Sequence, residues 1–285
     1  MSIRIPHLAI EITRRCNIKC SHCLRGESEN KDIPLEWIDV LLSQVKSINL
    51  LCFTGGEPTL NIPAIQYTIQ KIKENCISVD RFYIATNGMN ITREFVNYCL
   101  TLKSLCEYEN KCSVQISNDY YHSKEGDYND LLLKELSIYS KREYRDRAKL
   151  DNWELHKEGR STANHPKAYK KIYSPEIQSI DDLDDVPFYI NVNGHIINGC
   201  DWSYENQEKH KLCKVENLEK FYNAMKTNDD FIEQDWERMF EQDYSDRLQR
   251  QLEEKEEWQR WEYEQNKKRK PAKIEIIRTY KKEEK

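Results

Sequence analysis

The sequence predicts an α/β fold in which helices cover a parallel β-sheet. Two observations favour this prediction. Strand-like and helix-like segments alternate over residues 7–140, as they do in parallel sheets whose strands are joined by helices. The motifs that contain cysteine, glycine and polar residues each follow an expected strand, at the carboxyl edge where such sheets bind ligands.

Four short segments predict the strands of this sheet. Residues 49–55 (NLLCFTG) are largely apolar and end in glycine, which suits a buried strand. The third segment stops at Asn87-Gly88, a dipeptide typical of turns. The expected strands are residues 7–13, 49–55, 81–88 and 112–119.

Longer segments between and after these strands predict helices. Pro34 suits the first turn of the first of them. The expected helices are residues 35–45, 62–72, 92–106 and 129–140.

Composition excludes several classes of protein. The 285 residues carry a formal net charge of -5, and 38% of them are hydrophobic. No apolar run is long enough to span a membrane, and the first residues lack the apolar core of a secretion signal. We therefore expect a cytoplasmic protein with no membrane partner. The slight negative charge argues against a protein that works mainly by binding nucleic acid.

The cysteines give the strongest chemical signal. In a reducing compartment they are more often metal ligands, catalytic groups or core residues than disulfides. Cys16, Cys20 and Cys23 form a C-x3-C-x2-C motif directly after the first strand. Three thiolates so close in sequence can hold an iron–sulfur cluster and leave one iron open to an exogenous ligand. A zinc site is the alternative, although a structural zinc needs a fourth ligand.

Two further groups of residues, the cations that flank this motif and the cysteines outside it, have separate interpretations. Four cations flank it and would offset the negative charge of a thiolate-bound cluster: Arg14, Arg15, Lys19 and Arg25. Five further cysteines fall within expected strands, helices or their edges, where we expect them to fill the core: Cys52, Cys76, Cys99, Cys106 and Cys112.

A second motif, Gly55-Gly56-Glu57-Pro58, follows the second strand. Two glycines allow a ligand to approach the backbone, Pro58 stiffens the turn, and Glu57 offers a carboxylate to a cationic group. The tetrapeptide alone is equally well explained as a turn. Its pairing with the cysteine triad at the preceding strand end is what makes it specific.

Together, the triad and the GGEP sequence resemble the motifs of the radical SAM superfamily, most strongly over residues 7–119. The resemblance implies a partial (β/α)6 barrel that holds a [4Fe-4S] cluster through Cys16, Cys20 and Cys23. The open iron would bind S-adenosylmethionine (SAM), with Gly55 to Pro58 seating its methionine part. A reductant such as a flavodoxin or ferredoxin would supply one electron. Cleavage would then give methionine and a 5'-deoxyadenosyl radical that abstracts hydrogen from a substrate.

The same resemblance implies further cofactor contacts. His22, before the third cysteine, replaces a residue that is usually aromatic in the family and lies beside the adenine. Asn87 resembles a polar position near the ribose, and Ser117 and Asp119 resemble residues that contact the ribose or the methionine carboxylate. From the residues alone, Asn87-Gly88 is also a good turn, and residues 117–119 a good helix start.

Residues 187–206 predict a β-hairpin with its turn at Asn193-Gly194. This segment resembles the one that opens an extension with auxiliary clusters in peptide- and protein-modifying radical SAM enzymes. Only Cys200 and Cys213 lie beyond Cys112, so we expect no second cluster, which normally takes four thiolates.

Three other residues are candidates for a role with the substrate. Cys200 is a candidate hydrogen-atom donor or else an ordinary buried thiol. Tyr121, after the fourth strand, either faces the substrate or lines a helix start. Arg160 is a candidate to hold a carboxylate.

We expect three regions: a radical SAM partial barrel over residues 1–186, a β-hairpin extension over 187–226, and a charged helical tail over 227–285. In residues 241–285, 25 of 45 side chains are charged, which predicts a solvated helix or a docking arm. The hairpin and the arm favour a peptide or protein side chain as the substrate. A nucleotide or small molecule, or a non-catalytic metal-binding protein that docks a partner, are the alternatives.

Overall fold

The computed structural model describes residues 3–117, 122, 130–136, 139–142, 155–156, 158–164, 169–170 and 188–227. Its main sheet consists of β1 (Ile3–Thr13), β2 (Val45–Gly55), β3 (Ser78–Thr86), β4 (Ser113–Ser117), β5 (Tyr139–Arg142), β8 (Phe188–Ile190), β9 (His195–Asn198) and β10 (Lys211–Lys214). A separate sheet joins β6 (Leu155–His156) to β7 (Tyr169–Lys170).

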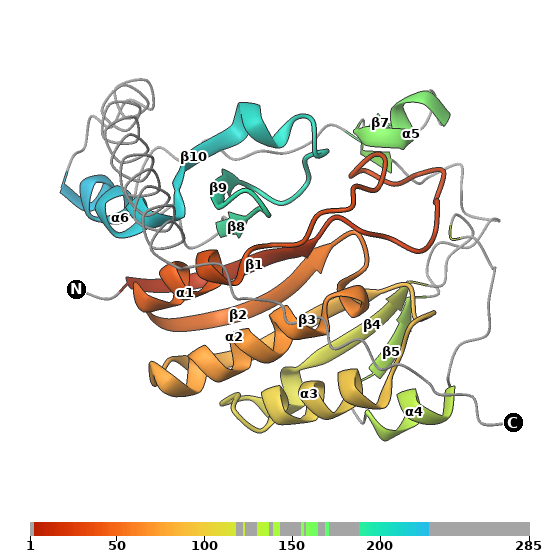
Figure 1. The fold of residues 1–285 in the computed structure, drawn as a ribbon, viewed down its shortest axis with the longest axis horizontal. Helices are drawn as coiled ribbons and strands as arrows, with labels where there is room; N and C mark the ends of the chain where they lie inside the picture. Colours follow the sequence, from red (N-terminus) through yellow and green to blue (C-terminus); the bar gives the residue numbers. More distant parts are fainter. Residues whose placement is uncertain are drawn as a thin grey trace, which may run out of the picture. The chain divides into compact units, whose positions relative to one another are not determined.

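The main sheet has the strand order β10-β9-β8-β1-β2-β3-β4-β5 (Figure 1). β8 and β1 to β5 run parallel to one another, whereas β9 and β10 pair antiparallel at one edge. The order ends at β10 on one side and at β5 on the other, so the sheet is open. The predicted α/β fold, with the parallel strands of a partial barrel, is therefore confirmed.

Helices follow the parallel strands. α1 (Leu35–Ser43), α2 (Ile62–Glu74) and α3 (Arg93–Lys103) connect β1 to β4 and run along the same face of the sheet (Figure 1). Three further helices, α4 (Asp130–Glu135), α5 (Gly159–Asn164) and α6 (Leu218–Thr227), follow β4, β6 and β10. Single 3-10 turns lie at Pro58–Leu60, Glu109–Lys111, Gln207–His210 and Val215–Asn217.

The two faces of the sheet carry different side chains because residues alternate along a strand. In β1, Leu8 and Ile10 are fully buried in the main core, which also contains the apolar residues of α1, α2 and α3. Ala9 belongs to a smaller cluster with Cys52 and Tyr189. The face opposite the helices thus carries a second, smaller hydrophobic cluster.

The segment after β4 differs from its prediction. A continuous helix is expected over residues 129–140, but α4 ends at Glu135 and Tyr139 begins β5. Tyr139 pairs with Val114 of β4. Aromatic and β-branched residues favour strands, and pairing with the open edge of β4 satisfies backbone groups that a helix would have to satisfy internally.

The predicted hairpin is present as β8 and β9, joined through a turn in which Gly194 has a φ of +76°. Its first strand pairs in parallel with β1, so that Ala9 lies beside Tyr189. The hairpin therefore extends the same sheet that carries the cysteine motif.

The expected core cysteines are buried with one exception. Cys52, Cys99, Cys106 and Cys112 are buried, but Cys76 is exposed, and the prediction was wrong for it. Cys76 has a φ of +52° and lies in the turn that connects α2 to β3. Among the described residues, we find no helix with the length and apolar character to cross a bilayer.

Candidate active site

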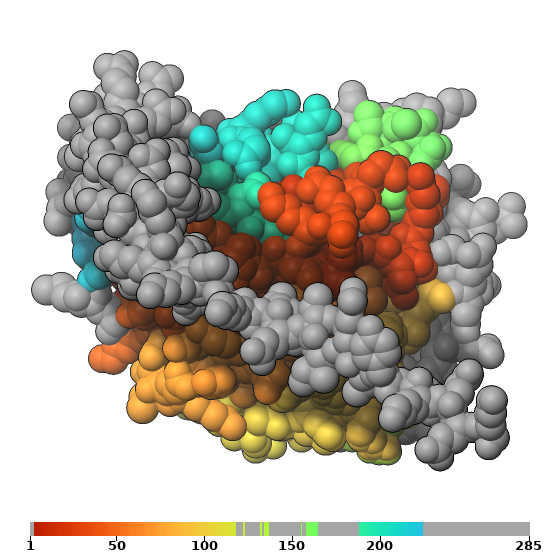
Figure 2. Space-filling model, in the orientation of Figure 1, coloured from red at the N-terminus to blue at the C-terminus, as the bar shows by residue number. Residues whose placement is uncertain are grey.

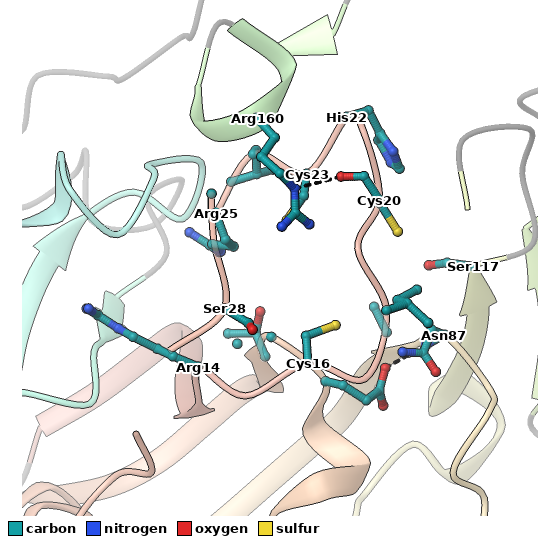
Figure 3. A pocket seen from close by; sticks show the side chains of 18 of the residues that line it. Arg14, Cys16, Cys20, His22, Cys23, Arg25, Ser28, Asn87, Ser117 and Arg160 are labelled. Atoms are coloured by element: carbon teal, nitrogen blue, oxygen red, sulfur yellow. Dashed lines mark hydrogen bonds between the residues drawn. The ribbon is translucent and has the colours of Figure 1, made fainter. Parts of the chain in front are cut away.

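The carboxyl ends of β1 to β4 surround one cavity of about 410 Å³, which we call the strand-end cavity (Figure 3). Its wall includes residues of the segment from residue 14 to residue 34, the cysteine loop, and of the turn after β2. The ends of β3 and β4 contribute Asn87 and Ser117. The motifs that are far apart in the sequence thus meet in one place.

All three motif cysteines line this cavity. Cys20 is buried, whereas Cys16 and Cys23 are partly exposed, and all three are free thiols. Burial raises the pKa of the Cys16 thiol, and a metal that binds there has to displace the thiol proton. Among the described residues, no three His, Cys, Asp or Glu side chains converge on a single-ion site. The three thiols therefore lie along the cavity wall and do not converge on the position of one metal ion.

Helix α5 holds the middle of the cysteine loop. The backbone N–H of Arg160 donates to the carbonyl of Cys23 over 2.9 Å, and its side-chain Nε donates to the carbonyl of Cys20 over 2.8 Å. A Cβ on Gly159 would lie 2.4 Å from the carbonyl oxygen of Leu24, so only glycine permits this contact. In Figure 2 the green helix and the red-orange loop adjoin at the surface.

The Arg160 side chain contacts both the cysteine loop and the strand-end cavity. Its guanidinium supports the cysteine loop and lies 3.5 Å from the Glu27 carboxylate. The side chain also lines the strand-end cavity and points toward the cysteines in Figure 3. The Nε atom of Arg160 is thus hydrogen-bonded to the cysteine loop, while the same side chain lines the cavity.

The two glycines of the GGEP turn bring β2 against the start of the cysteine loop. Gly56 N–H donates to the carbonyl of Thr13, and Glu57 N–H to that of Arg15, both over 2.8 Å. A Cβ on Gly55 would lie 1.9 Å from the Thr13 oxygen, and one on Gly56 would lie 2.2 Å from the Arg15 oxygen. The two glycines therefore allow the backbone of Thr13 and Arg15 to lie close against the turn.

The Glu57 carboxylate is buried beneath the cavity and bonds to the neighbouring strand end. Its Oε1 accepts hydrogen bonds from the backbone N–H and hydroxyl of Thr59 and from the hydroxyl of Thr86. Its Oε2 accepts one from the backbone N–H of Asn87 over 2.7 Å. Burial raises the pKa of Glu57, against the opposing effect of these hydrogen bonds. The carboxylate thus joins the ends of β2 and β3.

The predicted cofactor residues at the other strand ends share the same cavity. The side-chain amide of Asn87 donates to Asn17 over 2.7 Å, next to Cys16. Ser117 and His22 also line the wall. His22 stands edge-on to His122, with ring centroids 5.0 Å apart. Asp119 and Tyr121, both sequence candidates, lie outside the described residues.

Cys200 is placed elsewhere. Among the described residues, those that line the strand-end cavity do not include Cys200. Its side chain packs against the small cluster that contains Tyr189 and Ile197, and burial raises its pKa to about 11. The structure does not bring this thiol to the wall that the motif cysteines form.

The chain adds residues to the site that a local motif does not reveal. Tyr204, from the segment after β9, lines the cavity together with Arg14 and Arg25 of the cysteine loop. The Tyr204 ring lies 4.4 Å from the Arg14 guanidinium carbon. His122 is a further member of the wall. The only sequence signal for Tyr204 is its place within residues 187–206, the segment predicted as a hairpin.

This arrangement defines an open α/β protein with a cysteine-lined cavity at its strand ends. The family model described as Radical SAM superfamily matches residues 10–124. An uncharacterized protein of Methanocaldococcus jannaschii is 32% identical over 95 residues, which is 32% of this chain and 33% of that protein. The GTP 3',8-cyclase of Clostridium acetobutylicum is 37% identical over 93 residues, which is 30% of this chain and 28% of the cyclase.

Among solved structures, anSMEcpe with bound AdoMet and the Cp18Cys peptide aligns with 80% of this chain and 81% of its own, at 12% identity and a TM-score of 0.49. The curated relatives are matched over about a third of their length or less. The match to the radical SAM superfamily covers residues 10–124, less than half of the chain. The cofactors of that superfamily are a [4Fe-4S] cluster and SAM.

Proposed function

We propose that this chain is a radical SAM enzyme whose cluster is held by Cys16, Cys20 and Cys23. When bound and reduced, the [4Fe-4S] cluster supplies the electron that cleaves SAM to methionine and a 5'-deoxyadenosyl radical, which abstracts hydrogen from a substrate. The single observation that carries this proposal is the shared cavity. The three thiols, the GGEP turn and Asn87 all line it, although they come from three different strand ends.

The residues present fit these groups. Three thiols spread over a cavity wall suit a cluster whose irons lie apart from one another, and they leave one iron without a protein ligand. The backbone of Gly55 to Pro58 seats the methionine part of SAM. Glu57 keeps a negative charge near the SAM ammonium and orients Asn87 through its hydrogen bond. His22 and Asn87, which line the cavity, are assigned to the adenosine. Ser117 in the same wall, and Asp119, which lies outside the described residues, are assigned to the ribose or the methionine carboxylate.

For the substrate, we infer a peptide or protein side chain. The support is the hairpin β8–β9, which extends the sheet beside the cysteine loop, and the charged carboxyl-terminal sequence, in which a peptide partner would find many ionic contacts. A nucleotide is the second candidate, since two GTP 3',8-cyclases match this chain. Those matches cover only 28% of each cyclase. A flavodoxin or ferredoxin is the proposed reductant.

Anaerobic reconstitution with iron and sulfide tests the central proposal. We expect about four irons and four sulfides per chain, and 5'-deoxyadenosine and methionine after addition of SAM and dithionite. Cys16→Ala should lose the cluster, whereas the matched control Cys76→Ala, at an exposed thiol, should keep it. One zinc per chain with no 5'-deoxyadenosine would instead indicate a non-catalytic metal-binding protein and refute the enzyme.

A further inference from the structure

Arg25 occupies one side of the strand-end cavity. In Figure 3 it lies across the cysteine triad from Asn87 and Ser117, the proposed adenosine side. Its guanidinium donates to the carbonyl of Trp202 over 2.7 Å and stacks on the Tyr189 ring at 4.9 Å. These contacts fix the orientation of Arg25 from the β8–β9 side of the sheet.

Arg25 differs from the other arginines that line this cavity in its ionic partners. Arg14 lies 2.8 Å from Glu11 and 3.0 Å from Glu29, and Arg160 lies 3.5 Å from Glu27. Among the described residues, no carboxylate comes within ion-pair distance of Arg25, and its hydrogen bond goes to a neutral carbonyl. Arg25 is partly buried and lines the cavity, and a guanidinium that is partly removed from water is stabilised by an anion.

Tyr204 provides a second and independent observation. Its side chain is 93% buried and lines the same cavity, and within the described part of the chain its hydroxyl has no hydrogen-bond partner. The backbone N–H of Tyr204 donates to the carbonyl of Arg25 over 3.1 Å, so the two residues are adjacent. Burial raises the pKa of the Tyr204 phenol, which therefore keeps its proton. Buried hydroxyls are normally satisfied, and a ligand would satisfy this one.

We propose that Arg25 and Tyr204 form a subsite that binds an oxyanion of the substrate, a carboxylate or a phosphate, on the side of the cavity opposite the adenosine. An arginine and a phenol hydroxyl together supply charge-assisted and neutral donors to such a group. This proposal rests on the proposed function and adds the substrate chemistry to it. An anchored oxyanion would fix the substrate beside the triad, where its reacting C–H bond must lie.

The competing explanation for Arg25 is electrostatic. Its charge would then offset that of the thiolate-bound cluster and shift the reduction potential, with no part in substrate binding. The two roles are separable, because one changes the binding of an added anion and the other changes only the potential. Both are measurable without a known substrate.

The test uses the reconstituted full chain, with its cluster reduced by dithionite and without SAM. The reduced cluster is paramagnetic, so it broadens the NMR signals of nuclei held near it. The probes are inorganic phosphate, followed by 31P, and carboxyl-labelled acetate, followed by 13C. We expect saturable broadening of at least one probe. Arg25→Gln should weaken it about tenfold or more, the usual effect of losing a charged hydrogen bond, and Tyr204→Phe should weaken it by a smaller factor.

Lys19→Gln is the matched control. It removes one positive charge from the same loop at a side chain that is 73% exposed, and it should leave the broadening unchanged. Broadening by phosphate alone would assign a phosphorylated or nucleotide substrate, and broadening by acetate alone an acidic peptide. Equal binding in the wild type and Arg25→Gln, or equal loss in Lys19→Gln, would overturn the subsite. A shifted potential with unchanged anion binding would do so as well.

The proposed function is checked on the same samples. The wild type should form 5'-deoxyadenosine from SAM and dithionite, because the subsite does not hold SAM. If it forms none, the proposed function has failed. If it forms 5'-deoxyadenosine but binds no anion, only the subsite has failed.

Discussion

The backbone N–H of Gly56 donates a hydrogen bond to the carbonyl oxygen of Thr13 over 2.8 Å. This bond joins the ends of β1 and β2, and a second bond joins the GGEP turn to the cysteine loop. The second runs from Glu57 to Arg15. The geometry of the cysteine triad therefore depends on a turn more than thirty residues further along the chain.

Gly56→Ala should destabilise the protein through a backbone clash. The new Cβ would lie 2.2 Å from the Arg15 carbonyl oxygen, and moving that carbonyl would break the bond to Glu57. We expect a loss of about 3 kcal/mol or more in the free energy of unfolding, measured with urea on the apoprotein. Gly199→Ala is the control: it has a φ of +81° but no clash, and it should cost only about 1 kcal/mol. Equal losses would contradict the steric account.

Glu57→Gln should disturb Asn87 more than the turn itself. The remaining amide oxygen can accept the bonds from Thr59 and Thr86, but the new NH2 group would face the backbone N–H of Asn87. Two donors cannot bond to each other, so the strand end must shift. We expect the affinity of the reconstituted protein for SAM to fall about tenfold, as measured by equilibrium dialysis. The exposed Glu36→Gln is the matched control, and unchanged SAM affinity in Glu57→Gln would exclude this positioning role.

The strand ends and both motifs were predictable because each depends on a short stretch of sequence. The run that ends at Gly55 and the spacing from Cys16 to Cys23 are local patterns, and parallel pairing brings successive strand ends to one edge. The wall formed by Arg25 and Tyr204 was not predictable as a unit. It requires β8 to pair with β1, a contact across about 180 residues, and no local pattern encodes that pairing.

The hydrogen-bond partners of Glu57 were not predictable either, because they come from a different strand end. Its carboxylate looked free to meet a cationic group, yet Thr86 and Asn87 of the next strand end already bond to it. The sequence predicts which residue types gather at the edge of the sheet. It does not reveal which of their acceptor groups are already hydrogen-bonded to donors of the protein itself.

The titration of His7 should make the fold less stable in acid. Burial, assisted by the positive charge of Arg81, lowers the pKa of His7 below 6.5. The unfolded chain then binds the proton first, so stability is full above pH 6.5 and falls as the pH drops below it. Arg81→Gln should raise the pKa of His7, read from its imidazole NMR signals, and reduce the loss of stability between pH 7.5 and 5.5. Arg93→Gln, paired with Glu135 far from His7, should change neither quantity.

The Arg14 guanidinium forms one ion pair with a buried carboxylate and one with an exposed carboxylate, so the contributions of the two pairs to stability can be compared. Glu11 is fully buried, and its two oxygens accept bonds from Arg14, Tyr189, Gln207 and the backbone of Val192. Glu11→Gln would put an NH2 group against donors and leave Arg14 without its buried partner, at a cost of about 3–5 kcal/mol.

Glu29 meets the same guanidinium over 3.0 Å, but its side chain is 44% exposed. Water replaces much of that interaction, so Glu29→Gln should cost less than about 1 kcal/mol. Urea unfolding of both variants at pH 7 measures the difference. Because Gln207 and Tyr189 come from the β8 side of the sheet, Glu11→Gln should also increase hydrogen exchange in the hairpin, whereas Glu29→Gln should not. If the two variants lose the same stability, Glu11 does not connect the cysteine loop to that side of the sheet.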